Sequence, residues 1–204
     1  HAVKTSNSIA ELYDSRDDIA VITRSVVSKV PFLNEYTDKE KDNLGKYSSN
    51  LFTLNTFYSS IKRTIKGNIP NDAIQTFLCK YWNCVASNII QWNELNKKEI
   101  SKVDLRENYI VTQGVVIQAI GQVGAYFINN SETDMYKILK GLRIIDWRRS
   151  ATIWKNRVIR ADGKILTSNK AILLASNQIK KELGIPLLPD EELKEKRYLE
   201  SLTI

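Results

Sequence analysis

The most apolar part of the chain is residues 106–129, RENYIVTQGVVIQAIGQVGAYFIN, and this segment decides the expected fold. Its length and its dense apolar character favour a helix that is buried over most of its surface. Three amides, Gln113, Gln118 and Gln122, interrupt the apolar run. Because polar side chains are costly in hydrocarbon, the segment is not expected to span a membrane. It therefore predicts a central core helix.

Small residues recur on one face of this predicted helix. Gly114 and Gly121 lie seven positions apart, so they share a face, and Gly124 and Ala125 follow about one turn later. A face that lacks side-chain bulk allows another helix to approach closely. Two interpretations follow from this pattern. The face packs inside the core of the same chain, or it makes a contact between two copies of the chain.

The remaining segments are also expected to be helical. The chain has only eight glycines and four prolines, which limits the number of tight turns and strands. Capping residues predict where helices begin, at Asn71, at Ser168 or Asn169, and at Thr37, which opens a capping-box pattern. Gly184 is a predicted C-cap for the helix that begins near 168. These signals indicate an all-α protein with several helices.

One segment departs from the helical pattern. Asp162 and Gly163 stand between two short runs with β propensity, which is typical of a hairpin turn. We therefore expect one short β-hairpin near residues 157–166, within an otherwise all-α, multi-helix domain. Residues 1–204 are predicted to form a single helical domain, with a possible weak boundary near residue 131.

The net charge of +7 is concentrated in one part of the chain. Residues 140–170 contain nine lysines and arginines but only Asp146 and Asp162 as acids, so the rest of the chain is neutral in sum. A charge excess confined to one segment produces a directional field, which favours contact with a polyanion. The alternative is a basic surface that serves only solubility.

The basic segment surrounds two tryptophans, Trp147 and Trp154, which share a face if the segment is helical and are then expected to point inward. Lys170 lies in the first turn of a predicted helix, where a cation is unfavourable unless an anion such as phosphate binds there. We therefore predict that double-stranded DNA is the partner. The residues expected to contact it are Arg148, Arg149, Lys155, Arg157, Arg160, Lys164 and Lys170.

The sequence offers no support for catalysis. It contains no phosphate loop, no nucleophile elbow and no zinc-protease motif, and the whole chain has one histidine. Cys79 and Cys84 are five residues apart in a helical pattern, on different faces, so a disulfide or a metal site is not expected. We expect a protein without cofactor or metal that is not an enzyme. No apolar run reaches the length of a membrane span, so a cytoplasmic protein without a membrane partner is expected.

Four strings in succession resemble the DndB family of DNA sulfur modification proteins: HAVKTSNSIAELYDSRDD at 1–18, TDKEKDNLGKYSSNLFTLNTFY at 37–58, DWRRSATIW at 146–154 and LGIPLLPDEE at 183–192. Members of that family carry an N-terminal domain with a DGQHR signature, which this sequence lacks. In the family, the string that matches residues 1–4 follows that domain. The resemblance thus implies that the chain corresponds to the C-terminal helical portion of a longer protein.

The resemblance implies a DNA-binding repressor that regulates the genes of DNA phosphorothioation. It also implies double-stranded DNA and other proteins of the same system as partners. Two other functions remain open. The chain could be a module for protein interaction or homo-oligomer formation, or a lid for the DGQHR domain. The lid hypothesis assigns contact with that domain to His1, Asp14, Arg16 and Asp17.

Overall fold

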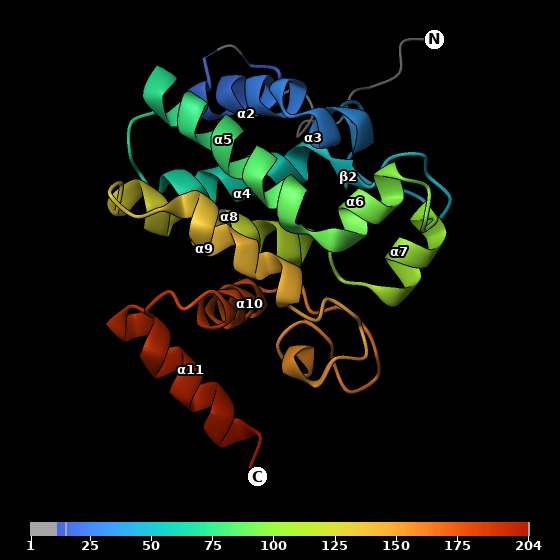
Figure 1. Ribbon diagram of the computed structural model, residues 1–204, viewed down its shortest axis with the longest axis vertical. Helices are drawn as coiled ribbons and strands as arrows, with labels where there is room; N and C mark the ends of the chain where they lie inside the picture. The colour runs from blue at the N-terminus through green and yellow to red at the C-terminus, as the bar shows by residue number, and fades with distance from the viewer. Residues whose placement is uncertain (1–11, 15, 204) are drawn as a thin grey trace.

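The computed structural model describes residues 12–14 and 16–203, which form a mostly helical protein, as expected (Figure 1). Its elements in chain order are α2 (Asp18–Lys29), α3 (Pro31–Tyr36), β1 (Thr37–Asp38), β2 (Phe52–Thr53), α4 (Leu54–Ile65), α5 (Asp72–Asn88), α6 (Ile90–Asn96), α7 (Lys102–Asn108), α8 (Gly114–Asn129), α9 (Met135–Leu139), η1 (Lys140–Ile144), η2 (Thr152–Trp154), α10 (Asn169–Glu182) and α11 (Pro189–Ser201). The η segments are short 3-10 helices.

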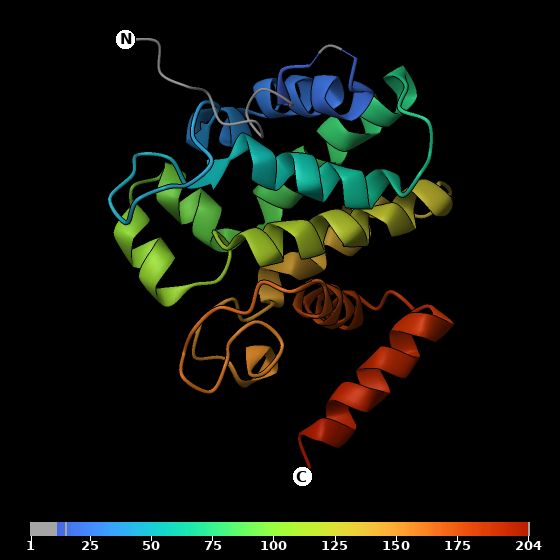
Figure 2. The same cartoon turned by 180° about the vertical axis from the view of Figure 1, so that it is seen from behind.

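The helices lie in layers around α8. In Figures 1 and 2, α2 and α3 lie at one end of the molecule, α4 and α5 come next, and α8 with α9 follows. On the other side of α8, α10 lies between the loop of residues 145–168 and α11, which forms the far edge in both views. The predicted central helix is therefore confirmed as the element between the two halves of the molecule.

Within the described residues, the one sheet is the parallel pair of β1 and β2, with Thr37 opposite Phe52. The helix predicted to begin at Thr37 does not form. The Asp38 carboxylate accepts the backbone N–H groups of Glu40 and Lys41 at 2.9 and 3.0 Å, which fixes a turn. Such side-chain bonds to nearby backbone compete with helix formation, so the capping-box prediction at this position is wrong.

The closest helix packing is between α4 and α8. A Cβ atom built on Gly121 would lie 2.1 Å from the Ser60 Oγ and 2.5 Å from the Ser60 carbonyl oxygen. The Ser60 hydroxyl donates to the Ile117 carbonyl (2.8 Å), and the Thr64 hydroxyl donates to the Gly121 carbonyl (2.6 Å). The small-residue face of α8 is thus covered by α4 of the same chain. This confirms the core interpretation and excludes this face as a contact between copies.

Aromatic side chains fill the core on the α4 and α5 side of α8. Phe32 and Trp92 stack with their ring centroids 4.5 Å apart, and Phe57 meets Trp82 edge-on at 5.2 Å. All four rings are buried. Rings of this size remove a large apolar area from water and add favourable edge or stacking geometry. This half of the molecule is therefore held by apolar contacts.

The buried apolar cluster extends from Leu12 to Ile185. Phe127 near the end of α8 and Met135 at the start of α9 both belong to it. The residues between these two helices form a turn at the surface. The weak boundary near residue 131 stays a prediction, and the core on its two sides is one continuous cluster.

The predicted helix boundaries at three capping residues are confirmed. The Asn71 side chain accepts the Ile74 N–H at 2.9 Å, and the Ser168 hydroxyl accepts the Ala171 N–H at 3.2 Å. Gly184 follows the end of α10 with a φ of +69°, a conformation that glycine adopts without strain. These local bonds satisfy backbone groups that a helix end leaves without a partner.

The chain reverses at the predicted hairpin, although the strands are minimal. Ile159 and Ile165 form a single antiparallel bridge, and the Arg160 N–H donates to the Lys164 carbonyl at 2.8 Å. Gly163 has a φ of +80°, as the turn requires. The reversal near residues 157–166 is confirmed, and its pairing is limited to one bridge.

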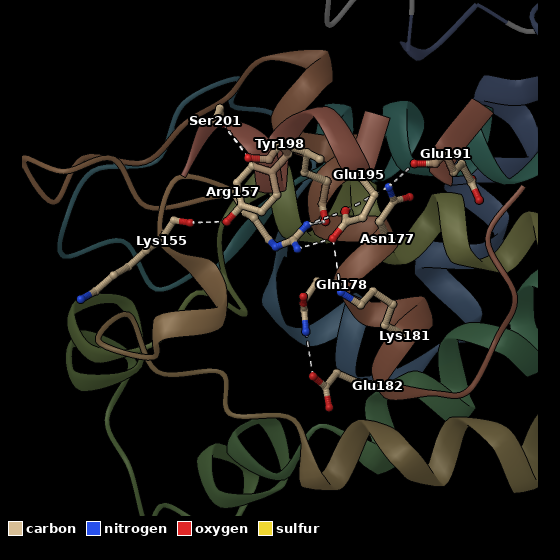
Figure 3. A network of polar contacts seen from close by, with 11 residues as sticks. Lys155, Arg157, Asn177, Gln178, Lys181, Glu182, Glu191, Glu195, Tyr198 and Ser201 are labelled. Carbon is tan, nitrogen blue, oxygen red and sulfur yellow. Dashed lines mark hydrogen bonds and ion pairs between the residues drawn. The ribbon is translucent and has the colours of Figure 1, made fainter. Parts of the chain in front are cut away.

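Charged side chains attach α11 to the rest of the protein (Figure 3). The face of α11 that is buried carries Glu191, Glu195 and Tyr198. The Lys180 Nζ lies 2.7 Å from a Glu191 oxygen, and the Arg157 guanidinium makes a two-pronged contact with Glu195, in which one N···O distance is 2.8 Å. All four charged side chains are at most 7% exposed. Ion pairs therefore replace apolar packing over this part of the contact.

Arg157 lies inside this network and not on the surface. The residue is 3% exposed, its guanidinium lies over the Tyr198 ring at 4.1 Å from the centroid, and it also donates to the Leu174 carbonyl. Burial would raise the pKa of Glu195, but the hydrogen bonds from Arg157 and Asn177 and the charges of Arg157 and Lys181 together hold that pKa below its ordinary value. The prediction that Arg157 belongs to an exposed DNA contact surface is wrong, because its donors are used by Glu195 and the backbone.

The α4–α8 contact predicts a strong effect of a single methyl group. Gly121→Ala should destabilise the protein by about 3 kcal/mol, because the new Cβ overlaps backbone atoms of α4 and the helices must separate. Gly114→Ala is the matched control, since its Cβ would meet Thr56 at an ordinary 3.8 Å. Urea unfolding should therefore separate the two variants clearly. Equal midpoints would contradict this account of the contact.

The buried ion pair predicts that Arg157→Met destabilises the protein by about 3 kcal/mol, because the buried Glu195 carboxylate would lose its two-pronged partner and keep only the more exposed Lys181, at 3.3 Å. Arg160→Met is the control, since its ion pair is exposed and should contribute at most about 1 kcal/mol. Thermal unfolding followed by circular dichroism measures both. A difference below the error of the measurement would show that the Arg157 contact is not important for stability.

Candidate nucleic-acid interface

The loop of residues 145–168 is anchored by its two tryptophans. Trp147 and Trp154 are both buried and stack with ring centroids 5.5 Å apart at an angle of 11°. The Trp147 indole donates to the Leu142 carbonyl at 3.1 Å, and the Trp154 indole donates to the Asp146 carbonyl at 2.6 Å. They point inward as predicted, but they are not on one helix, because only Thr152–Trp154 forms a short 3-10 turn.

Arg148 and Arg149 lie among acidic residues. The Arg148 guanidinium binds the Asp146 carboxylate at 2.6 Å, and this hydrogen bond raises the pKa of Arg148 and lowers that of Asp146. The Arg149 guanidinium donates to the Arg106 carbonyl at 3.2 Å. Both arginines line a cavity with three carboxylates, from Glu99, Asp104 and Glu107. The positive charge of this part of the loop is therefore largely compensated.

Arg160 and Lys164 are exposed at the turn but share one acid. The Arg160 guanidinium forms two hydrogen bonds to Asp162, one of them 3.0 Å long, and the Lys164 Nζ lies 4.0 Å from the same carboxylate. Lys155 is also exposed, and its backbone carbonyl accepts a hydrogen bond from the Tyr198 hydroxyl at 2.8 Å. Asp162 therefore offsets about one of the three positive charges of Lys155, Arg160 and Lys164.

Lys170 lies apart from the loop, in the first turn of α10, and lines a cavity between α4, α8, α10 and α11. This inner cavity measures about 510 Å³, and a second cavity of about 460 Å³ adjoins it through Arg63 and Asn169, which line both. We call the two together the cationic groove. The cations that line it are Lys62, Arg63, Lys170, Lys194 and Arg197.

The charge of the cationic groove is poorly compensated. No carboxylate is among the described residues that line its two cavities. Lys194 has an ion pair with Asp190 at 2.7 Å, one helical turn away on the exposed face of α11. Arg63 is half-buried, and its hydrogen-bond partners are the neutral amide oxygens of Gln118 (3.1 Å) and Asn169 (2.6 Å). Burial lowers the pKa of Arg63, which shows that its environment disfavours an isolated cation.

The structure brings together residues that the sequence interpretation separated or missed. Of the residues predicted to contact DNA, only Lys170 lines the cationic groove. Lys62 and Arg63 come from α4, more than 100 residues earlier, and Lys194 and Arg197 come from α11. A sequence signal exists for α4, where the last turn carries two adjacent cations. Its distance along the chain from residues 140–170 hid the connection.

The residues predicted to contact a further domain make local bonds. Arg16 and Asp14 form an exposed ion pair at 2.9 Å, and the hydrogen bond from Arg16 lowers the pKa of Asp14 to about 2. The Asp17 carboxylate caps α2 and also accepts a hydrogen bond from Tyr58 at 2.8 Å. His1 lies outside the described residues. The role of this set at a domain boundary stays a prediction.

The groups that could support other chemistry are few. Cys79 and Cys84 are free thiols, and burial raises the pKa of each above its ordinary value, so neither is activated as a thiolate. Within residues 12–14 and 16–203, no cluster of three or more histidines, cysteines or acids is placed to hold a metal ion. None of the helices in that part of the chain combines the length and the apolar character that a membrane span requires.

Comparisons with known proteins identify the family. Searches of curated proteins and of solved structures gave no significant match. A family model described as DndB, DNA-sulfur modification-associated, matches residues 1–186, which is most of the chain and includes every helix except α11. The resemblance found in the four sequence strings is therefore confirmed. The chain belongs to the DndB family of DNA-sulfur modification-associated proteins.

Proposed function

We propose that this chain binds duplex DNA and acts as a transcriptional regulator, a repressor, for the DNA phosphorothioation system. The observation that carries the proposal is the cationic groove, a concave surface with five cations and no carboxylate among its described lining residues. Membership in a family associated with DNA sulfur modification supplies the biological setting. In that setting DNA is the expected polyanion. Contacts with its phosphates dominate the affinity of proteins for DNA.

The proposed contact surface differs from the one expected from the sequence alone. Its centre is the cationic groove, where Lys62, Lys170 and Arg197 are exposed and have no ion pair among the described residues. Lys155, Arg160 and Lys164, the exposed cations of the loop of residues 145–168, are proposed as secondary contacts outside the groove. Arg148 and Arg149 contribute less, because the nearby acids repel phosphates. Arg157 contributes indirectly, because its ion pair with Glu195 holds α11 in place.

Contact with phosphates would proceed by electrostatic docking. Flexible lysines and arginines replace condensed counterions on the duplex, and the released ions provide the driving force. The first turn of α10 adds backbone N–H groups and the positive end of a 14-residue helix. Contacts of this kind set position and affinity but do not read the base sequence. Recognition of an operator would need further contacts to base edges.

The first test is the salt dependence of binding. If about four phosphates are neutralised, the logarithm of the association constant should fall with the logarithm of salt concentration with a slope of about −3.6. Fluorescence anisotropy with a labelled duplex at several salt concentrations measures this slope. A slope near zero would mean that phosphate contacts do not hold the complex, and the proposal would fail.

The second test locates the surface. Reversing two groove charges, Lys62→Glu with Lys170→Glu, should weaken duplex binding by a factor of about 100 or more, since each contact contributes on the order of 1 kcal/mol and each reversal adds repulsion. Lys97→Glu with Lys41→Glu is the control, because both lysines are exposed and lie outside the groove. A third variant, Arg160→Glu with Lys164→Glu, measures the share of the loop. Equal losses for the groove and control variants would remove the groove from the contact surface.

A further inference from the structure

The inner cavity of the cationic groove is also large enough to hold a small molecule. Its volume of about 510 Å³ lies in the range of pockets that enclose small ligands. Leu173 and the buried Leu174 form an apolar wall on α10. The charged residues that line it come from α4, α10 and α11. The cavity thus offers apolar side chains and cations at one site.

The side-chain amide of Gln122 lines this cavity. Gln122 is 7% exposed, and its side chain makes no hydrogen bond to any residue that the structure describes. Its amide oxygen and nitrogen are not sealed off from solvent, so they are open to a ligand in the cavity. An amide offers a donor and an acceptor side by side, which is the pair that the edge of a nucleobase requires. Gln122 is therefore suited to hydrogen-bond a ligand in the cavity.

The cations around the cavity are arranged for phosphate. Lys170 and Arg197 have no ion pair among the described residues, and Arg63 has only neutral partners. The early helix α4 and the two consecutive late helices α10 and α11 supply these charges, and like charges repel when they gather without an anion. An anionic group at the rim would offset this repulsion and could also accept bonds from the first turn of α10.

We propose that the inner cavity binds a mononucleotide, with the base against Leu173 and Leu174, the Gln122 amide on the base edge, and the phosphate between Lys170 and Arg197. A free phosphate ion would leave the apolar wall and the amide unused. A hydrophobic ligand would leave the cations unpaired. A nucleoside monophosphate satisfies all three kinds of group.

This inference goes beyond DNA binding and does not rest on it, because it concerns a free ligand and the DNA-free protein. It has a consequence for regulation, however. Lys170 lies both in the inner cavity and on the proposed DNA surface. A bound nucleotide would add negative charge to that surface, so the nucleotide and the duplex should compete.

The test is calorimetric titration of the whole chain, without DNA, against each of the four ribonucleoside 5′-monophosphates, their nucleosides and inorganic phosphate. At least one nucleotide should bind with one-to-one stoichiometry and at least about tenfold more tightly than phosphate or its nucleoside, since each half of the ligand contributes contacts. Gln122→Leu should reduce the affinity for that nucleotide toward that for phosphate and leave phosphate binding unchanged.

The matched pair of variants is Arg197→Glu and Lys196→Glu. The two positions are adjacent and exposed on α11, but only Arg197 lines the cavity. Arg197→Glu should lower nucleotide affinity about tenfold or more and Lys196→Glu should not, with circular dichroism showing that both fold.

Equal losses of nucleotide affinity in the two variants, or a nucleotide that binds no more tightly than phosphate, would overturn the proposal. If no nucleotide binds while Arg197→Glu weakens duplex binding, the cavity belongs to the DNA path. Loss of salt-dependent duplex binding, in contrast, would bear only on the proposed function.

Discussion

The contact between α4 and α8 sets the position of the polar groups on which the proposed site depends. Because Gly121 has no side chain, α4 lies against the backbone of α8, and hydroxyls of α4 bond its carbonyls. Arg63 is on this same part of α4, beside Gln118 of α8. A wider separation of α4 and α8 would move the Arg63 guanidinium away from Asn169 at the N-terminus of α10. The α4–α8 contact therefore packs the apolar core and also positions one side of the cationic groove.

Elements of the fold were predictable from the sequence mainly where hydrogen bonds between residues close in sequence determine them. Asn71 and Ser168 cap helices through bonds to backbone groups three residues away, and such bonds leave a clear pattern. At Thr37 equally local bonds, which the Asp38 carboxylate accepts from two backbone N–H groups, favour a turn, although the sequence pattern resembles a helix cap. Gly163 made the hairpin turn predictable. The two strands pair at only one bridge.

The site was less predictable, because charge density along a chain is not charge density in space. Arg148 and Arg160 each bond an aspartate two residues away, so the segment neutralises part of its own charge. Arg157 shares the same segment and is buried against a helix 38 residues later. The uncompensated cations come from α4, α10 and α11, and only the packing of these helices places them together. A basic segment is thus weak evidence for the surface that it will form.

The attachment of α11 constrains how relatives of this chain can vary. Arg157 and Lys180 lie within the matched region, residues 1–186, whereas the carboxylates that neutralise them come from Glu195 and Glu191 beyond it. A desolvated cation without its counter-charge is strongly unfavourable. Homologues whose last helix still covers these positions but lacks the two carboxylates should therefore carry uncharged side chains at positions 157 and 180, so that residues on the two sides of this junction should covary.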